Sequence, residues 1–406
     1  MQASNPLTVL MLTSSYPRDR EDSAGIFLRH MAEGLARRGV AVHVLAPAAE
    51  QAGSSVEGGV VVHRFRYLPS PLRNLAYGSG ILSNLKRLPW LWAEVPFFIL
   101  MMTVSLFRLL RKERPHLVHA HWLIPQGLIA VLAKLFYKVP VVSTAHGSDV
   151  FALRGRAFDR LRQYVLRQSD AWTANSLATA EAVGERTLLP TPNILPMGVD
   201  IRPFQGGRAT NLRATLPENE FLLLFVGRLV EQKGVEHLLQ AMALLPEGLR
   251  ARTNLWVVGD GQDRGRLEQQ AQALAIDGKV RFWGHVSNDR LPDFYATADL
   301  FVAPSGGAEG QGLVLSEASA SRLCVLATRA GATQEIVRDG ITGVLVQPHQ
   351  PQELADAIAT LLSDKPLRDK LAENALARVK QLYDVENTAR EFETLYRTIL
   401  ARRQAV

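Results

Sequence analysis

Short apolar runs rich in β-branched residues recur along the whole chain, and amphipathic segments separate them. Strands that alternate with helices in this way are typical of parallel α/β units. The first half contains TVLMLTSS, VAVHVLAP, VVVHRF, HLVHAHW, PVVSTAHG, AWTANS and NILPMG, and the second half contains LLLFVGRL, LWVVGDG, VRFWGHV, LFVAPSGG, LCVLATRAG and TGVLVQP. The sequence therefore predicts two doubly wound parallel-sheet domains in series.

The length of the chain supports this division. A chain of 406 residues exceeds the usual size of one hydrophobic core. Proline and glycines at 196–211 separate the last strand of the first half from the first strand of the second half. We therefore predict domains at 1–200 and 201–382, followed by a C-terminal helix at 383–406.

Positive charge is concentrated in the first half of the chain. Residues 1–200 hold 22 Lys or Arg against 14 Asp or Glu, whereas residues 201–406 hold 24 against 25. Nine of the basic residues lie within 64–114, around the apolar stretch 89–107. This combination indicates either a surface for anionic lipid headgroups or a lipid-linked phosphate, or an ordinary solvated face.

The apolar stretch itself has three interpretations. A transmembrane helix is one, but Glu94, Pro89 and Pro96 leave a short clean run. A buried helix or a helix that dips partly into a membrane fits better. The region carries no nucleic-acid-binding motif and no aromatic stacking pattern, so we do not expect a nucleic acid as partner.

Cysteine usage and the N-terminus bear on the compartment. The single cysteine, Cys324, lies in an apolar run typical of a buried strand and can form no internal disulfide. The N-terminus has neither a positive segment before its apolar run nor a small-residue cleavage site. We expect a cytoplasmic protein that is peripheral on the inner face of the cell membrane if the basic apolar segment contacts lipid.

Two cations follow the strand LLLFVGRL, where the chain reads GRLVEQKG. Arg228 offers a planar fork for phosphate oxygens and Lys233 a mobile point charge, so together they could neutralise a diphosphate. A solvated turn is the alternative for an arbitrary pair of this kind.

Two carboxylates, Glu309 and Glu317, stand in the stretch SGGAEGQGLVLSEASA. Gly310 and Gly312 would let the backbone approach a ligand, and the helix that follows offers free N–H groups to a phosphate. The carboxylates fit an acid/base pair of a glycosidase, two anchors for separated hydroxyl groups, or ordinary loop and helix-surface positions.

Histidines mark the strand ends of the first half. His119 and His121 alternate along one strand and so face the same side, and His146 and Asp149 follow the next strand. A metal site is conceivable, but no Asp-x-Asp motif is present, and we expect no metal or other cofactor. His119 is expected to be structural.

The motif E-G-x-G-L-x-x-x-E, with G-R-L-x-x-x-K-G upstream, resembles the retaining glycosyltransferases of family 4. The resemblance covers nearly the whole chain. It implies the GT-B fold, in which two Rossmann-like domains face a cleft and the C-terminal helix returns to the N-terminal domain. It also implies transfer of a sugar from a nucleoside diphosphate sugar, with UDP or GDP, to an acceptor hydroxyl.

The resemblance assigns the donor to the second domain. Arg228 and Lys233 would bind the diphosphate, Glu309 the hydroxyls of the sugar, and Glu317 the ribose. Other positions would act through the backbone: Gly310, Gly312, Leu313 and Val314 near the sugar or phosphate, and Val286 near the nucleobase, where a strand-end core residue is the alternative.

The resemblance assigns the acceptor to the first domain. His146 would lie near the sugar and the acceptor, with Asp149 and His121 as weaker candidates. The loop between the first strand and the first helix would approach the phosphates through Gly25, or Gly25 would simply begin the helix, which we expect Ser23 to cap.

The basic apolar segment makes a lipid-linked saccharide of bacterial surface or extracellular polysaccharide assembly the expected acceptor. Rival functions are a nucleotide-sugar epimerase of the same fold, a glycosidase, and a sugar-nucleotide-binding protein without catalysis.

Overall fold

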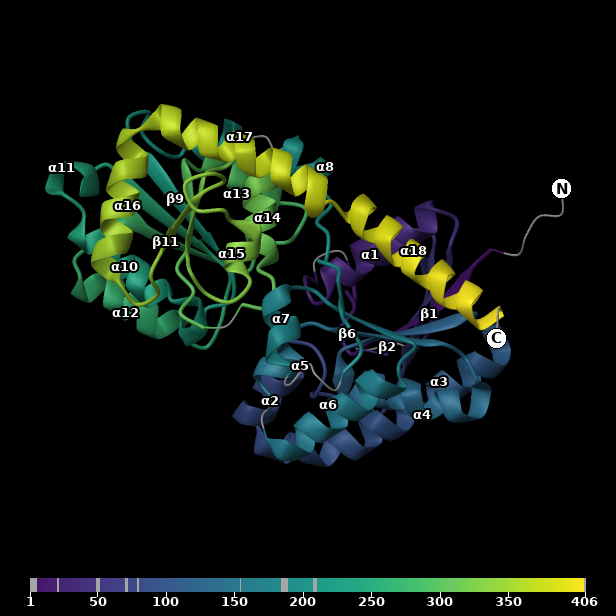
Figure 1. Cartoon of the computed structure of the whole chain (residues 1–406). Coiled ribbons are helices and arrows are strands. Elements are labelled where there is room, and N and C mark those ends of the chain that lie inside the picture. Colours follow the sequence, from purple (N-terminus) through teal and green to yellow (C-terminus); the bar gives the residue numbers. More distant parts are fainter. Residues whose placement is uncertain are drawn as a thin grey trace. The chain divides into compact units, whose positions relative to one another are not determined.

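The chain forms two compact units, which Figure 1 shows in colours that follow the sequence. A computed structural model describes residues 6–19, 22–48, 52–69, 72–78, 80–153, 155–183, 189–206, 210–307 and 309–404. Unit 1 comprises Met1–Gly198 and Val385–Val406, and unit 2 comprises Val199–Asp384. The chain thus changes unit within a few residues of the predicted positions 200 and 382.

Unit 1 is built on one sheet, in which the described strands have the order β3-β4-β2-β1-β5-β6-β7-β8. All neighbours are parallel except β3, which runs antiparallel to β4 at the edge. The strands are β1 Thr8–Leu12, β2 Ala41–Pro47, β3 Gly53–Glu57, β4 Val60–Phe65, β5 Leu117–His121, β6 Val141–Ala145, β7 Ala171–Ala174 and β8 Asn193–Ile194.

Helices pack against this sheet because each presents an apolar face to it. The helices of unit 1 are α1 Ile26–Arg37, α2 Ile81–Arg87, η2 Pro89–Glu94, α3 Val95–Glu113, η3 Leu123–Gly127, α4 Leu128–Tyr137, α5 Ser148–Phe151, α6 Arg156–Gln168, α7 Leu177–Ala182 and α18 Val385–Gln404. The C-terminal helix α18 returns to unit 1 and lies along α1, as predicted, with an ion pair of 2.6 Å between Arg38 and Glu393.

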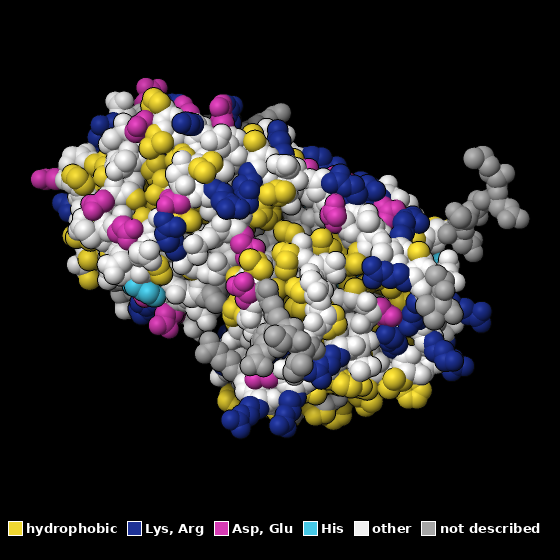
Figure 2. Space-filling view, in the orientation of Figure 1, with side chains coloured by type: hydrophobic (Ala, Val, Ile, Leu, Met, Phe, Trp, Pro, Cys, Tyr) yellow, Lys and Arg dark blue, Asp and Glu magenta, His cyan; other side chains and the backbone are white. Residues whose placement is uncertain are grey.

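The α3 helix buries one apolar face in the core of unit 1 and leaves another apolar face partly exposed. Phe98, Met102 and Leu106 are buried on one face, whereas Phe97 and Leu100 on another face are half-exposed. By length and composition, the stretch Pro89–Glu113 could cross a membrane, with a mean hydropathy of 1.7. Figure 2 shows hydrophobic side chains at the lower edge of this unit, where Figure 1 places α3 and α4, with Lys and Arg beside them.

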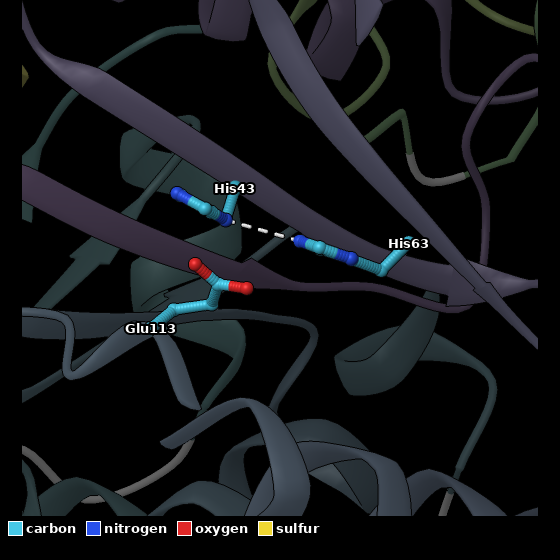
Figure 3. Close-up of side chains that lie close together, drawn as sticks. All are labelled: His43, His63 and Glu113. Atoms are coloured by element: carbon cyan, nitrogen blue, oxygen red, sulfur yellow. Dashed lines mark hydrogen bonds between the residues drawn. The ribbon is translucent and has the colours of Figure 1, made fainter. Parts of the chain in front are cut away.

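A pair of histidines lies on neighbouring strands of the same sheet. The register pairs Leu45 of β2 with His63 of β4, so His43 and His63 face the same side. Their rings are stacked at 5.3 Å, and His43 Nδ1 lies 3.0 Å from His63 Nε2 (Figure 3). The end of α3 brings Glu113 to this pair.

Unit 2 is built on a second sheet, whose described strands are all parallel and have the order β11-β10-β9-β12-β13-β14. This is the doubly wound order in which the direction of winding reverses beside the first strand. The strands are β9 Phe221–Val226, β10 Thr253–Val258, β11 Val280–Gly284, β12 Leu300–Ala303, β13 Val325–Thr328 and β14 Val344–Val346.

The strands of unit 2 are nearly continuous apolar runs because helices cover both faces of a parallel sheet. Its helices are α8 Arg202–Gln205, α9 Thr210–Arg213, η5 Glu231–Lys233, α10 Val235–Leu244, α11 Glu247–Arg250, α12 Arg264–Ala273, η6 Asp277–Lys279, α13 Leu291–Thr297, α14 Leu313–Ala320, α15 Thr333–Ile336, α16 Pro351–Ser363 and α17 Lys365–Leu382. Cys324 is buried there, as the sequence predicts, and burial raises its pKa to about 12.

Candidate active site

The winding of unit 2 brings two loops together at the carboxyl ends of β9 and β12. These strands are neighbours, with Leu224 paired to Phe301. One loop carries Arg228 and Lys233, and the other carries Glu309. Ligands of open α/β sheets bind at this reversal of the strand order, so the topology itself places the predicted donor residues at a binding edge.

Backbone contacts fasten the two loops to each other. Gly234 has φ 66°, and a Cβ atom there would lie 2.1 Å from the carbonyl oxygen of Pro304. The amide N–H groups of Gly306 and Gly307 both donate to the carbonyl oxygen of Gln232, at 3.0 and 3.3 Å. Only glycine fits such a left-handed, close approach, so the cation-bearing loop is held in one position.

Glu309 is the centre of a compact polar group in unit 2. Its Oε1 accepts hydrogen bonds of 2.6 Å from Lys233 Nζ and of 2.6 Å from Ser305 Oγ. Burial alone would raise the pKa of Glu309, but the ion pair with Lys233, the Ser305 hydroxyl and the charge of Arg228 hold that pKa below its usual value. Glu309 is therefore an anion next to two cations at neutral pH.

The backbone of Glu309 is fixed from the next loop along the sheet. Ala332 N donates to Glu309 O at 3.0 Å. Gly331 has φ 53°, and a Cβ atom there would lie 2.5 Å from Glu309 O. These contacts hold the backbone of Glu309, and so help to position its side chain, from a neighbouring loop as well as from its own loop.

The α14 helix begins directly after the glycines. Gly312, with φ 80°, is its N-cap and makes no side-chain capping bond. The first amides of a helix, here those of Leu313 and Val314, have no partner within the helix and can donate to an anion. The helix start therefore lies where the sequence predicts it, and the role of the E-G-x-G-L segment in binding a sugar or phosphate stays a prediction.

Glu317 lies farther along α14 in a different environment. Tyr295 Oη donates to Glu317 Oε2 at 2.8 Å, and Tyr295 is itself fully buried. Burial raises the pKa of Glu317, although the hydrogen bond from Tyr295 opposes the shift.

Val286 follows β11, is partly buried, and packs against the core cluster that contains Tyr295. Its alternative interpretation as a strand-end packing residue therefore matches its position.

The polar residues of unit 1 also gather where strands end. His121 closes β5 and His146 follows β6, with His121 Nδ1 3.0 Å from His146 Nε2. Burial lowers the pKa of His146 to about 3, and burial first, then the neighbouring histidines, lower the pKa of His121 far below its usual value. Both imidazoles are neutral at physiological pH.

Three buried polar atoms at these strand ends lack a hydrogen-bond partner within the described part of the chain. They are His121 Nε2, His146 Nδ1 and Asn175 Oδ1, which come from the ends of β5, β6 and β7. Buried polar groups are normally paired, so three unpaired atoms at one edge of the sheet indicate a ligand or ordered water there.

Asp149 is engaged by the backbone. Its Oδ2 accepts from Leu123 N at 2.8 Å and its Oδ1 accepts from His146 N at 3.1 Å. Burial raises the pKa of Asp149, although these amides oppose the shift. Asp149 therefore fixes the segment that carries His146.

His119, in contrast, is satisfied on both ring nitrogens, by Tyr396 Oη at 2.7 Å and Thr144 Oγ1 at 2.6 Å, so its predicted structural role is confirmed.

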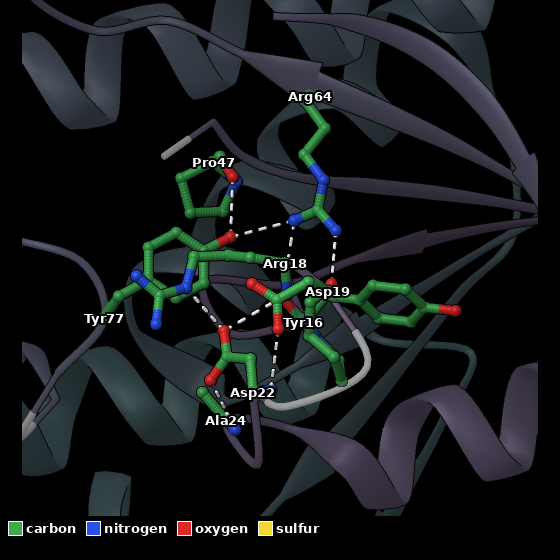
Figure 4. A network of polar contacts seen from close by, with 9 residues as sticks. Tyr16, Arg18, Asp19, Asp22, Ala24, Pro47, Arg64 and Tyr77 are labelled. Atoms are coloured by element: carbon green, nitrogen blue, oxygen red, sulfur yellow. Dashed lines mark hydrogen bonds and ion pairs between the residues drawn. The ribbon is translucent and has the colours of Figure 1, made fainter. Parts of the chain in front are cut away.

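The loop between β1 and α1 is held by a polar network (Figure 4). Arg64 donates to the carbonyl oxygens of Tyr16 and Pro17 and to Tyr77 Oη. Asp22 accepts from Arg18 Nε at 2.6 Å and from Ala24 N at 3.0 Å. The network fixes the loop that the family resemblance places near the phosphates.

Gly25 ends this loop and begins α1. It is the N-cap with φ 73°, and a Cβ atom there would lie 2.4 Å from Ser15 O, so glycine is required. The prediction that Ser23 caps the helix by its side chain is wrong. Ser23 contributes only its carbonyl oxygen, which accepts from Ile26 N at 3.3 Å, because the left-handed Gly25 takes the N-cap position.

The fold and the two groups of polar residues define an α/β protein with Rossmann-like units and ligand-binding edges at the strand ends. Residues 24–198 match the model of the Glycosyl transferase 4-like domain, and residues 210–378 match that of Glycosyl transferases group 1. The chain is 30% identical to a D-inositol 3-phosphate glycosyltransferase of Corynebacterium urealyticum, over 92% of this chain and 90% of that protein. The chain therefore belongs to the glycosyl transferases group 1 family, glycosyltransferase family 4, and is a nucleotide-sugar-dependent glycosyltransferase.

Other similar proteins agree with this family and fold. The putative teichuronic acid biosynthesis glycosyltransferase TuaC of Bacillus subtilis is 26% identical over 97% of this chain and 99% of its own length. Sucrose-phosphate synthase from Thermosynechococcus elongatus has a TM-score of 0.81 at 23% identity, over 98% and 100% of the two chains. Anabaena Alr3699/HepE in complex with UDP-glucose has a TM-score of 0.74 at 24% identity, over 96% and 99%. The predicted GT-B fold is confirmed.

Proposed function

We propose that this glycosyltransferase moves a hexose from UDP to a hydroxyl group of a lipid-linked saccharide, with retention at the anomeric carbon. The Lys233–Glu309 ion pair at the strand-order reversal of unit 2 carries the proposal. Arg228 would bind the diphosphate with Lys233, Glu309 would bind hydroxyls of the sugar, and Glu317 would bind the ribose.

The charges of the unit 2 group favour an anionic ligand. Arg228 and Lys233 carry two positive charges against the single negative charge of Glu309, so the group retains a net positive charge. The amides at the start of α14 add hydrogen-bond donors beside it. A leaving diphosphate gains negative charge as the glycosidic bond breaks, and fixed cations and donors stabilise that change.

The neutral histidines of unit 1 suit hydrogen bonding better than proton abstraction. A general base works best with a pKa near the working pH, and the pKa of His146 lies at about 3. We infer that His146 orients hydroxyl groups, and that an oxygen of the departing phosphate accepts the proton of the acceptor. This fits front-face displacement with retention, which is typical of the family.

The donor is the first part of the proposal to test. HepE, at 24% identity, binds UDP-glucose in its crystal structure, which favours a UDP-sugar over a GDP-sugar here. A ligand that binds only the native state raises the melting temperature. We expect UDP-glucose or another UDP-hexose to raise it more than GDP-mannose or ADP-glucose, and Lys233→Ala to abolish the shift. Equal shifts with all three nucleotides would refute the choice of base.

Transfer must also be separated from epimerisation and from binding alone. We expect release of free UDP to require an added acceptor, because a transferase breaks the donor bond only when a hydroxyl group accepts the sugar. NMR of the product would then show the anomeric configuration of the donor. Interconversion of the donor without an acceptor would instead identify the epimerase, and an absence of turnover with every acceptor would leave a binding protein.

The acceptor half carries an exposed apolar surface that supports a membrane-bound acceptor. We call it the α3–α4 face, and its exposed large residues are Trp90, Trp92, Phe97, Leu100, Leu132, Leu135 and Phe136. Ring contacts join the two helices, with Phe107 of α3 5.8 Å from Phe136 of α4. An exposed patch of this kind is rare unless it meets a membrane or a partner.

Basic residues border the α3–α4 face. The exposed ones on the neighbouring helix ends and turns are Lys86, Arg87, Arg108, Arg111, Lys112, Arg114 and Lys138. Aromatic side chains that enter the interface and cations that meet anionic headgroups together bind a protein to a membrane surface, at roughly 1 kcal/mol for each cation near the surface. We therefore place the chain on the anionic inner face of the cell membrane.

Vesicle sedimentation tests this placement. We expect the protein to bind vesicles that contain phosphatidylglycerol, to release them at high salt, and to bind weakly when Leu135 or Trp92 becomes Ser. Leu244→Ser is the matched control, because Leu244 is 48% exposed and lies in unit 2. Equal binding by all three variants, or none by the native protein, would contradict the membrane assignment without affecting the assignment of the donor.

A further inference from the structure

We propose that His43, His63 and Glu113 form a binding site for a divalent transition-metal ion, with zinc as the expected ion. The residues come from β2, β4 and the last position of α3. Their candidate ligand atoms lie within 4.8 Å of one another, and Figure 3 shows the Glu113 carboxylate beside the two rings. Two imidazoles and one carboxylate are a ligand set that zinc uses in proteins.

The spacing of the two ring nitrogens fits a shared ion. His43 Nδ1 and His63 Nε2 are 3.0 Å apart. Two nitrogens bound to one tetrahedral zinc ion at about 2.0–2.1 Å lie about 3.3 Å from each other. The pair therefore needs to open by only a few tenths of an ångström, and the parallel β2 and β4 strands hold both rings on one side of the sheet.

Ser54 orients one of the two rings. Its Oγ lies 2.8 Å from His63 Nδ1, on the side of the ring opposite the pair. When His63 Nδ1–H donates to this hydroxyl, the lone pair of Nε2 points toward His43 and Glu113. In histidines that bind metals, the ring nitrogen that does not bind the ion usually donates a hydrogen bond to a partner of this kind.

A lysine lies beside the carboxylate of the group. Glu113 Oε1 lies 3.0 Å from Lys112 Nζ. Lys112 is 75% exposed and is the group with which an ion would compete.

The position of the site indicates a structural task. His43 is the third residue of β2, and Glu113 lies just before β5, whereas His121 and His146 stand at the carboxyl ends of strands. A bound ion would join the end of α3, whose other face is the exposed α3–α4 face, to the two strands. The inference does not depend on the proposed donor or acceptor.

Metal titration of the full-length protein tests the inference. After removal of metals with a chelator, calorimetry with Zn²⁺ should show one tight site, and Co²⁺ should give the visible absorption of a low-symmetry complex. We expect His63→Gln and Glu113→Gln each to weaken zinc binding more than tenfold and Ser54→Ala to weaken it about tenfold. Lys112→Ala should strengthen it, because the competing ammonium is gone.

A second close pair of histidines supplies the control. His237 Nε2 and His349 Nδ1 lie 2.9 Å apart in unit 2. His349→Gln should leave zinc binding unchanged, and zinc should raise the melting temperature of this variant but not that of Glu113→Gln. Equal affinity in all variants, or loss of binding in His349→Gln alone, would overturn the proposal. Circular dichroism of the metal-free variants shows whether each is folded.

Discussion

Acid should destabilise unit 1 through its buried neutral histidines, and His146 allows this to be measured. Burial holds the pKa of His146 at about 3 in the folded protein, against an ordinary value of 6.5. Because the unfolded chain binds a proton that the folded chain does not, the stabilising effect is complete above pH 6.5 and declines as the pH falls below that value. The perturbation is a change from pH 7.5 to pH 5.0, compared between the native protein and His146→Gln.

The magnitude follows from the difference between the two pKa values. At pH 5.0 an unfolded histidine is protonated and His146 in the fold is not, so each pH unit below 6.5 costs about 1.4 kcal/mol. The pH change should therefore lower the free energy of unfolding of unit 1 by about 2 kcal/mol through His146 alone. Glutamine does not titrate, so His146→Gln should lose about 2 kcal/mol less than the native protein over the same interval.

Urea unfolding at both pH values measures this difference, with hydrogen exchange in β5 and β6 to assign the transition to unit 1. The other histidines, His119 and His121 among them, contribute to both proteins and largely cancel in the comparison. Equal losses in the two proteins would show that His146 protonates within the fold, and the argument from burial would fail. A neutral His146 also predicts that kcat/KM shows no acid limb from this residue between pH 5 and 7.

Three substitutions test the unit 2 site. Lys233→Ala should lower donor affinity and turnover at least tenfold, measured by thermal shift and by UDP release, because the diphosphate loses a cation; native values would refute its role. Glu309→Gln should lower kcat with little change in the KM for donor, since the amide still fills the site; a change in KM alone would assign Glu309 to uniform binding. Gly331→Ala should lower both kcat and the melting temperature, because a methyl group would press on Glu309 O, whereas Gly340→Ala, with φ 68° and open space, should affect only the melting temperature.

The architecture could be predicted because apolar and amphipathic segments alternate regularly along the sequence. Runs of apolar β-branched residues separated by amphipathic segments indicate parallel strands and covering helices, and both sheets appear as expected. The β3 strand was missed. Its residues Gly53–Glu57 are nearly all exposed, and an edge strand with polar side chains lacks the apolar signal by which the others are recognised.

The positions of the candidate residues could also be predicted, because parallel strands place their following loops at one edge. The hydrogen-bond partners of these residues are harder to predict. Asn175 directly follows β7 and Ser305 stands two residues after β12, so both could have been suspected from their positions. Tyr295, inside α13, carries no signal that connects it with Glu317. Such pairs come from elements far apart in the chain, so only the packing of helices and strands brings them together.

The Lys233–Glu309 pair resolves a conflict that the sequence alone does not reveal. In the proposed site, a carboxylate beside the diphosphate would repel the donor, yet Glu309 would have to lie close to hold the sugar. Lys233, at 2.6 Å, neutralises that charge while Arg228 keeps the group positive.

Lys233→Ala should then remove more than a phosphate contact, because it leaves a buried carboxylate that keeps its hydrogen bond from Ser305 but has lost its ion-pair partner, next to the proposed diphosphate site. Adding Glu309→Gln to Lys233→Ala removes this repulsion, so the double variant should bind UDP more tightly than Lys233→Ala alone, although Glu309→Gln on its own should not tighten binding. Calorimetric titration with UDP on the three variants and the native protein gives the coupling between the two sites. Strictly additive effects would show that Lys233 and Glu309 act independently, and the charge-neutralising role of Lys233 would have to be abandoned.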